Sequence, residues 1–268
     1  MVMKKQPPLN YAFAIGKIRA LEKFLIKQEV FQEAIESNLE EALRLFVESG
    51  LYSEELLHIR DSRHLEEVLS QELLKVKHLI GSLLLDKELL CFIELDDLAK
   101  MQKICKGFAG EFLSDYLMHM LDMQNIKTFL RLYVLKEPEE KLKLHITSEG
   151  FMEKGTFLKC YAQDLLVFLN RLEFVHKRSQ IIDYAYFLKE PIQKLKQNDS
   201  FVALEKAIDD FLMRVLKPAK YLSFGPEPLL AYYFAKANEI NLMRMIILAK
   251  LNNFSNDLVK ERLNSVYA

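Results

Sequence analysis

Apolar residues recur at steps of three and four along most of this chain, and few helix-breaking residues interrupt them. From Leu230, steps of this size reach Tyr233, Ile240, Ile247 and Leu251, which share one face of an α-helix. Only eight glycines and seven prolines occur among 268 residues, so the frequent turns of a β-rich fold are not available. The pattern predicts an all-α fold.

One position on this apolar face carries a cation. Arg244 lies between Ile240 and Ile247, where an apolar side chain is expected. Two explanations are open. The guanidinium either pairs with an acid on an adjacent helix, which would fix the register of the two helices, or its alkyl part lies along the apolar face while the charged end reaches water.

A weak internal repeat relates two parts of the chain. A shift of 117 residues aligns the following pairs: Leu113 with Leu230, Tyr116 with Tyr233, Asp122 with Glu239, and Lys127 with Arg244. In both copies the acid precedes its cation by five residues, which turns a helix by about 140°. The acid and the cation of one copy therefore cannot pair with each other, and we expect their partners on neighbouring helices.

The strongest interruption of the helical pattern runs from Lys136 to Gly155, where Pro138, a charge run and two glycines follow one another. Such residues are typical of connections between helices. We expect an internal boundary here, with N-terminal helical units in residues 1–136 and C-terminal helical units in residues 137–268, all within one body. Smaller breaks are expected at Gly50 and near Asp61, and a helix is expected to end at Pro191.

The charge balance and the cysteines exclude several classes of protein. Net formal charge is −1, so no broad positive field favours a nucleic-acid partner. Cys91, Cys105 and Cys160 have no CxxC spacing, which argues against a disulfide framework and fits a reducing compartment. Pro7 and Pro8 interrupt the weakly apolar amino-terminal stretch, so we expect no signal peptide, and no uncharged run is long enough to span a membrane.

Catalytic signatures are absent from the sequence. The six histidines are scattered without HExxH spacing, and neither a phosphate-binding GxxxxGK[ST] nor a GxGxxG motif occurs. We therefore expect no metal, no cofactor and no small-molecule substrate. One enzymatic alternative is an all-α isoprenoid-diphosphate enzyme, which binds magnesium through aspartate-rich helices. The pairs Asp96–Asp97 and Asp209–Asp210 each lack the third acid, because Lys100 and Met213 stand four residues on.

The carboxyl-terminal segment, "FGPEPLLAYYFAKANEINLMRMIILAKLNNFSNDLVKERLNSVYA", resembles the end of the central-stalk C subunit of archaeal and bacterial V-type ATPases, which is related to the eukaryotic d subunit. The family pattern falls on these residues: Gly225, Glu227, Pro228, Leu229, Tyr232 or Tyr233, Lys236, Glu239, Arg244, Lys250 and Tyr267. Two further segments agree: "NYAFAIGKIRALEKFLI", with Arg19, Ala20 and Glu22, and "SDYLMHMLDMQNIKTFLR", with Asp122, Asn125, Ile126 and Arg131. The resemblance extends from about Tyr11 to Tyr267.

This resemblance implies a funnel-like body of repeated helical units around a pseudo-threefold axis, with the 117-residue repeat as two of them. It also implies a non-catalytic rotor component that couples the D and F subunits of the rotor shaft to the membrane proteolipid ring, so that ATP hydrolysis or synthesis is linked to H⁺ or Na⁺ transport. Such a component is cytoplasmic and peripheral to the membrane. The candidate interface residues are Glu227, Tyr233, Glu239, Arg244, Lys250, Tyr116, Asp122 and Lys127.

Two departures from the family pattern concern length and one residue. The chain is compressed between Lys136 and Phe201, and Ala249 stands where the family commonly has glycine. Each candidate residue could also match the pattern because folding alone requires it. A helical scaffold unrelated to ATPases is the remaining alternative, because it would explain the helical periodicity and the lack of catalytic motifs equally well.

Overall fold

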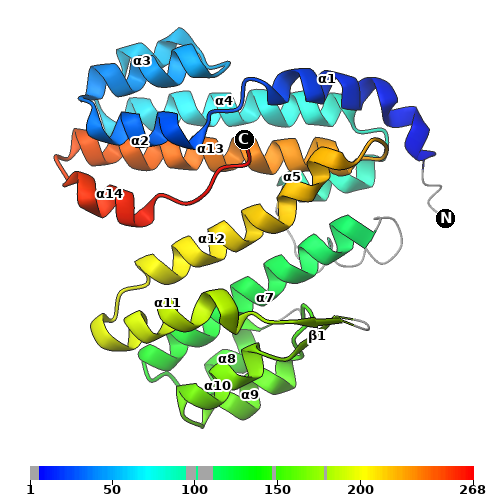
Figure 1. Cartoon of the computed structure of the whole chain (residues 1–268), viewed down its shortest axis with the longest axis vertical. Coiled ribbons are helices and arrows are strands. Elements are labelled where there is room, and N and C mark those ends of the chain that lie inside the picture. Colours follow the sequence, from blue (N-terminus) through cyan, green and yellow to red (C-terminus); the bar gives the residue numbers. More distant parts are fainter. Residues whose placement is uncertain (1–5, 95–100, 102–110, 147–148, 178–179) are drawn as a thin grey trace. The chain divides into compact units, whose positions relative to one another are not determined.

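The computed structural model describes residues 6–94, 101, 111–146, 149–177 and 180–268, and these are overwhelmingly helical (Figure 1). Two short strands, β1 (Val175–Lys177) and β2 (Gln180–Ile182), pair in antiparallel register, with His176 opposite Ile181. The expected all-α class is confirmed, with this hairpin as a small addition. The funnel with pseudo-threefold symmetry stays a prediction.

The chain separates into two compact units. Unit 1 combines residues 1–95 with residues 213–268, and unit 2 comprises residues 96–212. Unit 1 is thus built from both ends of the chain, while unit 2 is one continuous segment. The boundary expected near Lys136 lies inside unit 2, between α7 (Glu111–Val134) and α8 (Glu139–His145). The division into N-terminal and C-terminal helical units stays a prediction.

Unit 1 surrounds the long helix α13 (Glu227–Leu251). Its other elements are η1 (Pro8–Tyr11), α1 (Ala12–Glu22), α2 (Gln28–Glu36), α3 (Leu39–Ser49), η2 (Glu54–His58), α4 (Ser62–Leu83), η3 (Lys87–Leu90), α5 (Cys91–Glu94), η4 (Lys217–Tyr221) and α14 (Asn256–Arg262). Helix α13 packs along α4 and also contacts α1, α2, α3, α5 and α14. It is buried around most of its circumference over its first turns, not along a single stripe, because helices cover it on several sides.

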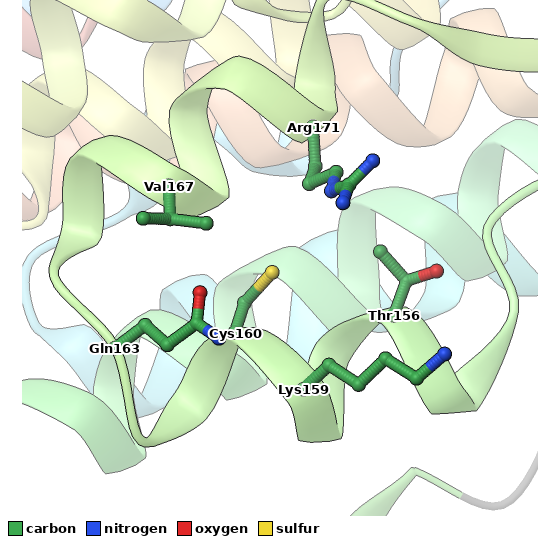
Figure 2. A pocket seen from close by; sticks show the side chains of 6 residues that line it. All are labelled: Thr156, Lys159, Cys160, Gln163, Val167 and Arg171. Atoms are coloured by element: carbon green, nitrogen blue, oxygen red, sulfur yellow. The ribbon is translucent and has the colours of Figure 1, made fainter.

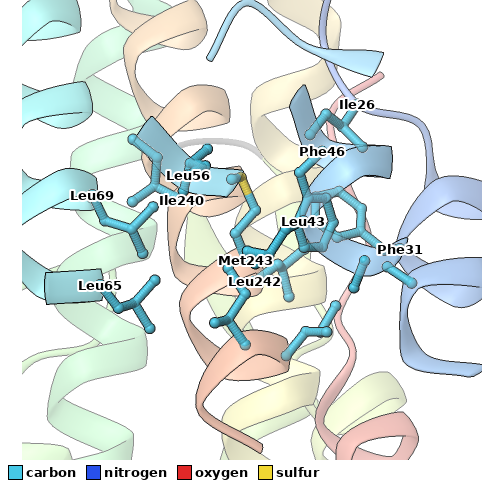
Figure 3. Close-up of a cluster of buried hydrophobic side chains, with 14 of the residues drawn as sticks. Ile26, Phe31, Leu43, Phe46, Leu56, Leu65, Leu69, Ile240, Leu242 and Met243 are labelled. Atoms are coloured by element: carbon cyan, nitrogen blue, oxygen red, sulfur yellow. The ribbon is translucent and has the colours of Figure 1, made fainter. Parts of the chain in front are cut away.

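The core of unit 1 forms where α13 meets the helices of the amino-terminal half (Figure 3). Ile240 and Met243 of α13 share one buried cluster with Leu65 of α4 and Phe46 of α3, and all four side chains are almost completely buried. Burying a side chain of this size stabilises the fold by about 1.5–3 kcal/mol. Residues far apart in the sequence therefore hold unit 1 together.

Local sequence signals explain several helix ends. Asn38 caps α3 by accepting a hydrogen bond from Glu41 N, and Asp61 caps α4 by accepting one from His64 N. Helix α3 ends before Gly50, as expected. The helix end expected at Pro191 is wrong, because Pro191 lies inside α11 (Ala185–Asn198). Proline removes one backbone hydrogen bond, and the buried side chains of α11 on both sides of it keep the helix continuous: Leu188, Ile192 and Leu195.

Unit 2 is organised around α7 (Glu111–Val134). The other elements that the structure describes in this unit are α8 (Glu139–His145), α9 (Lys154–Tyr161), α10 (Leu165–Leu172), the β hairpin, α11 and most of α12 (Val202–Leu216). An aromatic cluster fills its core, in which the rings of Phe129 and Phe168 stack 4.0 Å apart and Phe157 packs against both. Such ring contacts add to the stabilisation that burial alone provides.

Candidate functional site along α13 and α7

The first candidate residue lies at the start of α13. Gly225 precedes the helix with φ of 94°, a conformation that residues with a Cβ rarely adopt. A Cβ on Gly225 would also lie 2.2 Å from Glu227 Oε2, so the buried Glu227 carboxylate occupies the space that a side chain would need. Negative charge is favourable at this end of a helix, where backbone N–H groups are unpaired. Glu227 therefore stabilises the amino-terminal end of α13.

Tyr233 lies two turns further along α13 and is buried. Its hydroxyl donates a hydrogen bond to the carbonyl oxygen of Ile93 at 2.9 Å, which links α13 to α5. Burial raises the pKa of Tyr233 to about 12, so the hydroxyl keeps its proton and remains a donor at neutral pH.

Glu239 is the centre of a buried polar cluster in unit 1. Its carboxylate accepts hydrogen bonds from Lys236 Nζ at 2.7 Å, from the Tyr52 hydroxyl at 2.8 Å and from Ile26 N at 2.7 Å. Lys236 Nζ also lies 3.9 Å from the centre of the Tyr52 ring, an arrangement that stabilises a cation. Burial raises the pKa of Glu239, and these three donors oppose that rise. The cluster holds α13 to the segment before α2 and to the segment after α3.

Arg244 pairs with an acid on an adjacent helix, as one of the two explanations predicted. Its Nε donates to both carboxylate oxygens of Glu66 on α4, at 2.9 and 3.0 Å, and its Nη1 donates to Asn241 at 2.6 Å. The side chains of Arg244 and Glu66 are 27% and 48% exposed. Water therefore screens this pair much more than it screens Glu239 and Lys236.

Lys250 lies in the last turn of α13 and reaches the carboxyl end of α2. Its Nζ donates a hydrogen bond to Ile35 O at 3.0 Å and another to Ser37 O. Carbonyl groups at a helix end lack intrahelical partners and attract cations. Burial lowers the pKa of Lys250, and the neighbouring Glu36 opposes that change. Lys250 thus fastens α2 to α13.

Asp122 occupies a corresponding position in unit 2, on α7. Its carboxylate is fully buried and accepts hydrogen bonds from Phe151 N and Met152 N, both at 3.0 Å, and from the Tyr184 hydroxyl at 2.8 Å. Burial raises the pKa of Asp122 to about 7, against the effect of the three donors. A Cβ on Gly150 would lie 2.2 Å from Asp122 Oδ1, so the loop approaches the carboxylate closely only because Gly150 has no side chain.

His119 continues this cluster one turn earlier on α7. Its Nδ1 lies 2.8 Å from the Tyr184 hydroxyl. Because that hydroxyl donates its proton to Asp122, we infer that His119 is the neutral tautomer with a proton on Nδ1. Burial, followed by the charge of Lys177, lowers the pKa of His119 to about 4, and Asp115 opposes the change. The ring is enclosed by Phe151, Tyr184 and Phe211.

The two remaining candidates are Tyr116 and Lys127, which align with Tyr233 and Arg244. Tyr116 is buried, as Tyr233 is, and burial raises its pKa. Lys127 is half-buried, but none of the acids that the structure describes forms an ion pair with it. The pairing expected for both cations thus holds for Arg244 and not for Lys127 within the described part of the chain.

The internal repeat does extend to the aligned acids. Glu239 and Asp122 each accept one or more backbone N–H groups and one tyrosine hydroxyl from a segment distant in sequence. A third cluster of this kind is apparent only in the structure, where Asp86 accepts hydrogen bonds from Gln6 N at 2.9 Å and from the Tyr11 hydroxyl at 2.8 Å. No motif signals it, because Tyr11 and Asp86 are 75 residues apart.

A surface hollow lies between α9 and α10 (Figure 2). Its volume is about 350 Å³, and six side chains line it: Thr156, Lys159, Cys160, Gln163, Val167 and Arg171. None of the candidate residues lines this hollow, so the family pattern gives it no role.

The structure also shows where possible metal ligands, the aspartate pairs and the cysteines lie. Among the residues it describes, no three His, Cys, Asp or Glu side chains are placed to hold a metal ion. Asp210 forms an ion pair with Lys206 at 3.2 Å, while Asp96, Asp97 and Cys105 lie outside the described residues. Cys91 and Cys160 are both buried, and Cys160 is a free thiol. Across the described ranges, no helix combines the length and apolar character needed to span a bilayer.

The fold and these clusters define an all-α protein in which most of the candidate polar side chains join helices within one unit. A family model described as ATP synthase (C/AC39) subunit matches residues 93–262, more than half of the chain, and the chain belongs to this family. This membership sets aside both the unrelated helical scaffold and the isoprenoid-diphosphate enzyme.

Two curated relatives agree with this assignment. The chain is 26% identical over 227 residues to the C subunit of the V-type sodium ATPase of Enterococcus hirae, a match that covers 83% of this chain and 66% of the relative. It is also 26% identical over 165 residues to the C subunit of the A-type ATP synthase of Methanocaldococcus jannaschii, covering 60% of this chain and 39% of the relative. The chain thus spans only part of each relative's length.

Proposed function

We propose that this chain is a non-catalytic central-stalk component of a rotary V/A-type ATPase. In this role it joins the D and F subunits of the rotor shaft to the membrane proteolipid ring and transmits rotation between them. Membership of the C/AC39 family and the names of both relatives support this proposal. The same role places the chain at the cytoplasmic face of the membrane as a peripheral component.

The architecture of α13 is the observation that carries the proposal. Side chains along this one helix fasten several separate segments of unit 1: α5 through Tyr233, the segments around α2 through Glu239 and Lys250, and α4 through Arg244. A helix fixed at several points along its length resists bending and sliding relative to its neighbours. Such a body suits a component that transmits torque without performing chemistry.

The candidate residues contribute to this role chiefly through the stiffness of the body. Glu227, Tyr233 and Glu239 are buried, and each is occupied within unit 1 or at the start of its own helix. Their side chains are therefore not available to a partner in this conformation. We propose that direct contacts with the ring and the shaft come from exposed side chains, for which the buried clusters provide a fixed base.

A bridging experiment tests the proposal. The D and F subunits of the shaft are immobilised, and detergent-solubilised proteolipid ring is added with or without the purified chain. We expect the ring to be captured only when the chain is present, and we expect the chain alone to hydrolyse no ATP. A chain with a folded helical circular dichroism spectrum that binds neither partner would contradict the proposal.

A matched pair of variants guards against indirect effects. Gly150→Ala should weaken the packing of unit 2. The Cβ that Gly155→Ala adds meets no other atom within 4 Å, so this variant should leave the packing unchanged. Bridging should persist in Gly155→Ala, which shows that substitution as such is harmless. If bridging were equally strong with a thermally unfolded chain, capture would not depend on the folded body and the coupling role would fail.

A further inference from the structure

Four large apolar side chains protrude into solvent where the amino-terminal segment meets the segment before α13. Leu9 is 67% exposed, Phe13 80%, Tyr221 86% and Phe224 53%. We call these four residues the protruding cluster. Single exposed apolar side chains are ordinary, but several on neighbouring segments form a candidate binding surface.

Hydrogen bonds bring the two segments together and hold them. Gly225 N donates to Pro8 O at 3.2 Å, beside Phe224 and Leu9. Arg19 Nη2 donates to Ala219 O and Leu222 O, both at 2.8 Å, on either side of Tyr221. The protruding cluster therefore stands on a fixed backbone, and its exposure is not the result of a loose loop.

The same two segments carry more cations than acids. Residues 6–21 and residues 213–226 contain no Asp or Glu, although the whole chain has a net charge of −1. They contain five cations: Lys17, Arg19, Arg214, Lys217 and Lys220. The acid after the first segment, Glu22, forms an ion pair with Arg19 at 2.7 Å, and the acid after the second segment, Glu227, is buried at the start of α13. With Glu22, Glu227 and Asp86, which accepts hydrogen bonds from Gln6 N and the Tyr11 hydroxyl, the cations outnumber the acids by five to three in a chain that is nearly neutral overall.

The cations lie next to the apolar side chains. Phe13 and Lys17 are four residues apart on α1 and share one exposed face. Lys220 Nζ lies 4.7 Å from the centre of the Tyr267 ring, and its pKa is lowered by burial first and by the charge of Lys217 second. Glu22 opposes this change, but it is paired with Arg19, so an anion outside the chain would further stabilise the two neighbouring lysines.

We propose that the protruding cluster and the lysines around it bind the headgroup layer of an anionic phospholipid bilayer. Aromatic and aliphatic tips enter the boundary between headgroups and acyl chains, while Lys17 and Lys217 contact lipid phosphates. Lysines suit this surface because their flexible side chains bind phosphate as point charges without a fixed geometry. Binding of this kind is shallow and reversible, which fits a peripheral component.

The chain contains no tryptophan, so one introduced tryptophan reports on its own surroundings. In the full-length Tyr221→Trp variant, we expect the emission to shift to shorter wavelength with vesicles of equimolar phosphatidylglycerol and phosphatidylcholine. Pure phosphatidylcholine vesicles should produce little shift. Raising the salt concentration should weaken binding to the anionic vesicles, because ions screen the lysine charges.

Control variants test whether binding depends on the protruding cluster and its lysines. Tyr186→Trp places the probe at a residue of unit 2 that is 82% exposed, and it should show no shift. Lys17→Gln with Lys217→Gln should weaken vesicle binding by about 25-fold, because each lysine near an anionic surface contributes about fivefold in affinity. Phe13→Ser should weaken it by about tenfold as well. Both variants should retain the parent's circular dichroism spectrum, because these side chains are exposed or half-buried.

Two competitors distinguish a bilayer from other anions. Inorganic phosphate at equal phosphate concentration should not reverse the shift of Tyr221→Trp, and soluble polyglutamate should not reproduce it. A shift with either competitor alone, or an equal shift in Tyr186→Trp, would overturn the proposal. So would the absence of any shift with anionic vesicles.

The outcome is separate from that of the bridging experiment, which is performed in detergent without a bilayer. Loss of ring capture in Phe13→Ser, together with no vesicle binding by the parent chain, would identify a protein-docking surface and exclude the lipid. Vesicle binding without ring capture would support the lipid surface and contradict the coupling role.

Discussion

At the scale of single residues, Glu239 and Lys236 form an ion pair that water hardly reaches, with side chains 3% and 5% exposed. Glu239→Gln leaves the lysine charge buried without its counter-charge, so we expect the free energy of unfolding to fall by about 3–5 kcal/mol. Urea titration followed by circular dichroism measures this loss. Adding Lys236→Met to Glu239→Gln should recover part of it, and a double variant less stable than Glu239→Gln would contradict the explanation.

Arg244 provides the contrast, since its pair with Glu66 is partly exposed. Arg244→Met should change the free energy of unfolding by no more than about 1 kcal/mol, because exposed pairs contribute little. The melting temperature of the variant, compared with that of Glu239→Gln, checks this ranking. If Arg244→Met were as damaging as Glu239→Gln, the pair would be doing more than aligning α13 with α4.

The Asp122–Tyr184–His119 cluster predicts an unusual pH dependence. The folded pKa of Asp122 is raised to about 7, so its contribution to stability is lost as pH rises from about 4 to 7. The folded pKa of His119 is lowered to about 4, so its contribution is lost as pH falls from about 6.5 to 4. The two slopes have opposite sign between pH 4 and 6.5, and the cluster as a whole should be nearly insensitive to pH there.

Single substitutions should expose each slope. In Asp122→Asn, stability should rise with pH between 4 and 6.5 by about 1.4 kcal/mol per pH unit relative to the parent chain, and in His119→Phe it should fall by a similar amount. Urea titrations at several pH values measure these differences. The slope is the decisive quantity, because either substitution can also lower stability at all pH values by disturbing the hydrogen bonds to Tyr184.

At the scale of secondary-structure elements, two glycines of unit 2 test how closely the loop before α9 approaches α7. Gly150→Ala would place a Cβ 2.2 Å from Asp122 Oδ1 and 2.4 Å from Met118 O, so we expect a loss of at least about 2 kcal/mol of stability. Gly155→Ala meets no atom within 4 Å near the start of α9 and should gain up to about 1 kcal/mol. The melting temperatures of both variants measure how tightly the loop packs against α7. Equal melting temperatures would mean that the loop shifts freely.

The helices of this chain could be predicted from the sequence better than the contacts between them. Periodicity and caps predicted the helical class and the breaks at Gly50 and Asp61, because these signals lie within a few residues of one another. The prediction was wrong at Pro191, where tertiary packing outweighs one missing hydrogen bond. The candidates Tyr233 and Glu239 were identified, but their partners could not be, since Ile93 and Ile26 lie 140 and 213 residues away.

At the scale of the whole molecule, unit 1 depends on segments from both ends of the chain. The carboxyl-terminal residues Asn264, Val266 and Tyr267 are buried within it. Val266 N donates to Gln28 Oε1 at 3.0 Å, and Asn264 Nδ2 donates to Asn238 at 2.9 Å. The last segment thus connects α2 with α13, two elements from opposite ends of the sequence, and the cost of closing so long a loop must be met before such contacts form.

Deleting residues 264–268 should therefore weaken unit 1 far more than the loss of five residues suggests. Removal of the two buried apolar side chains alone should lower the free energy of unfolding by about 3–6 kcal/mol. Hydrogen exchange followed by mass spectrometry should show faster exchange in α2 and α13, with α9 and α10 of unit 2 much less affected. Deletion of the exposed Ala268 alone is the control and should leave all four helices unchanged. Unchanged protection of α2 after the longer deletion would mean that the two ends of the chain are not energetically joined in unit 1.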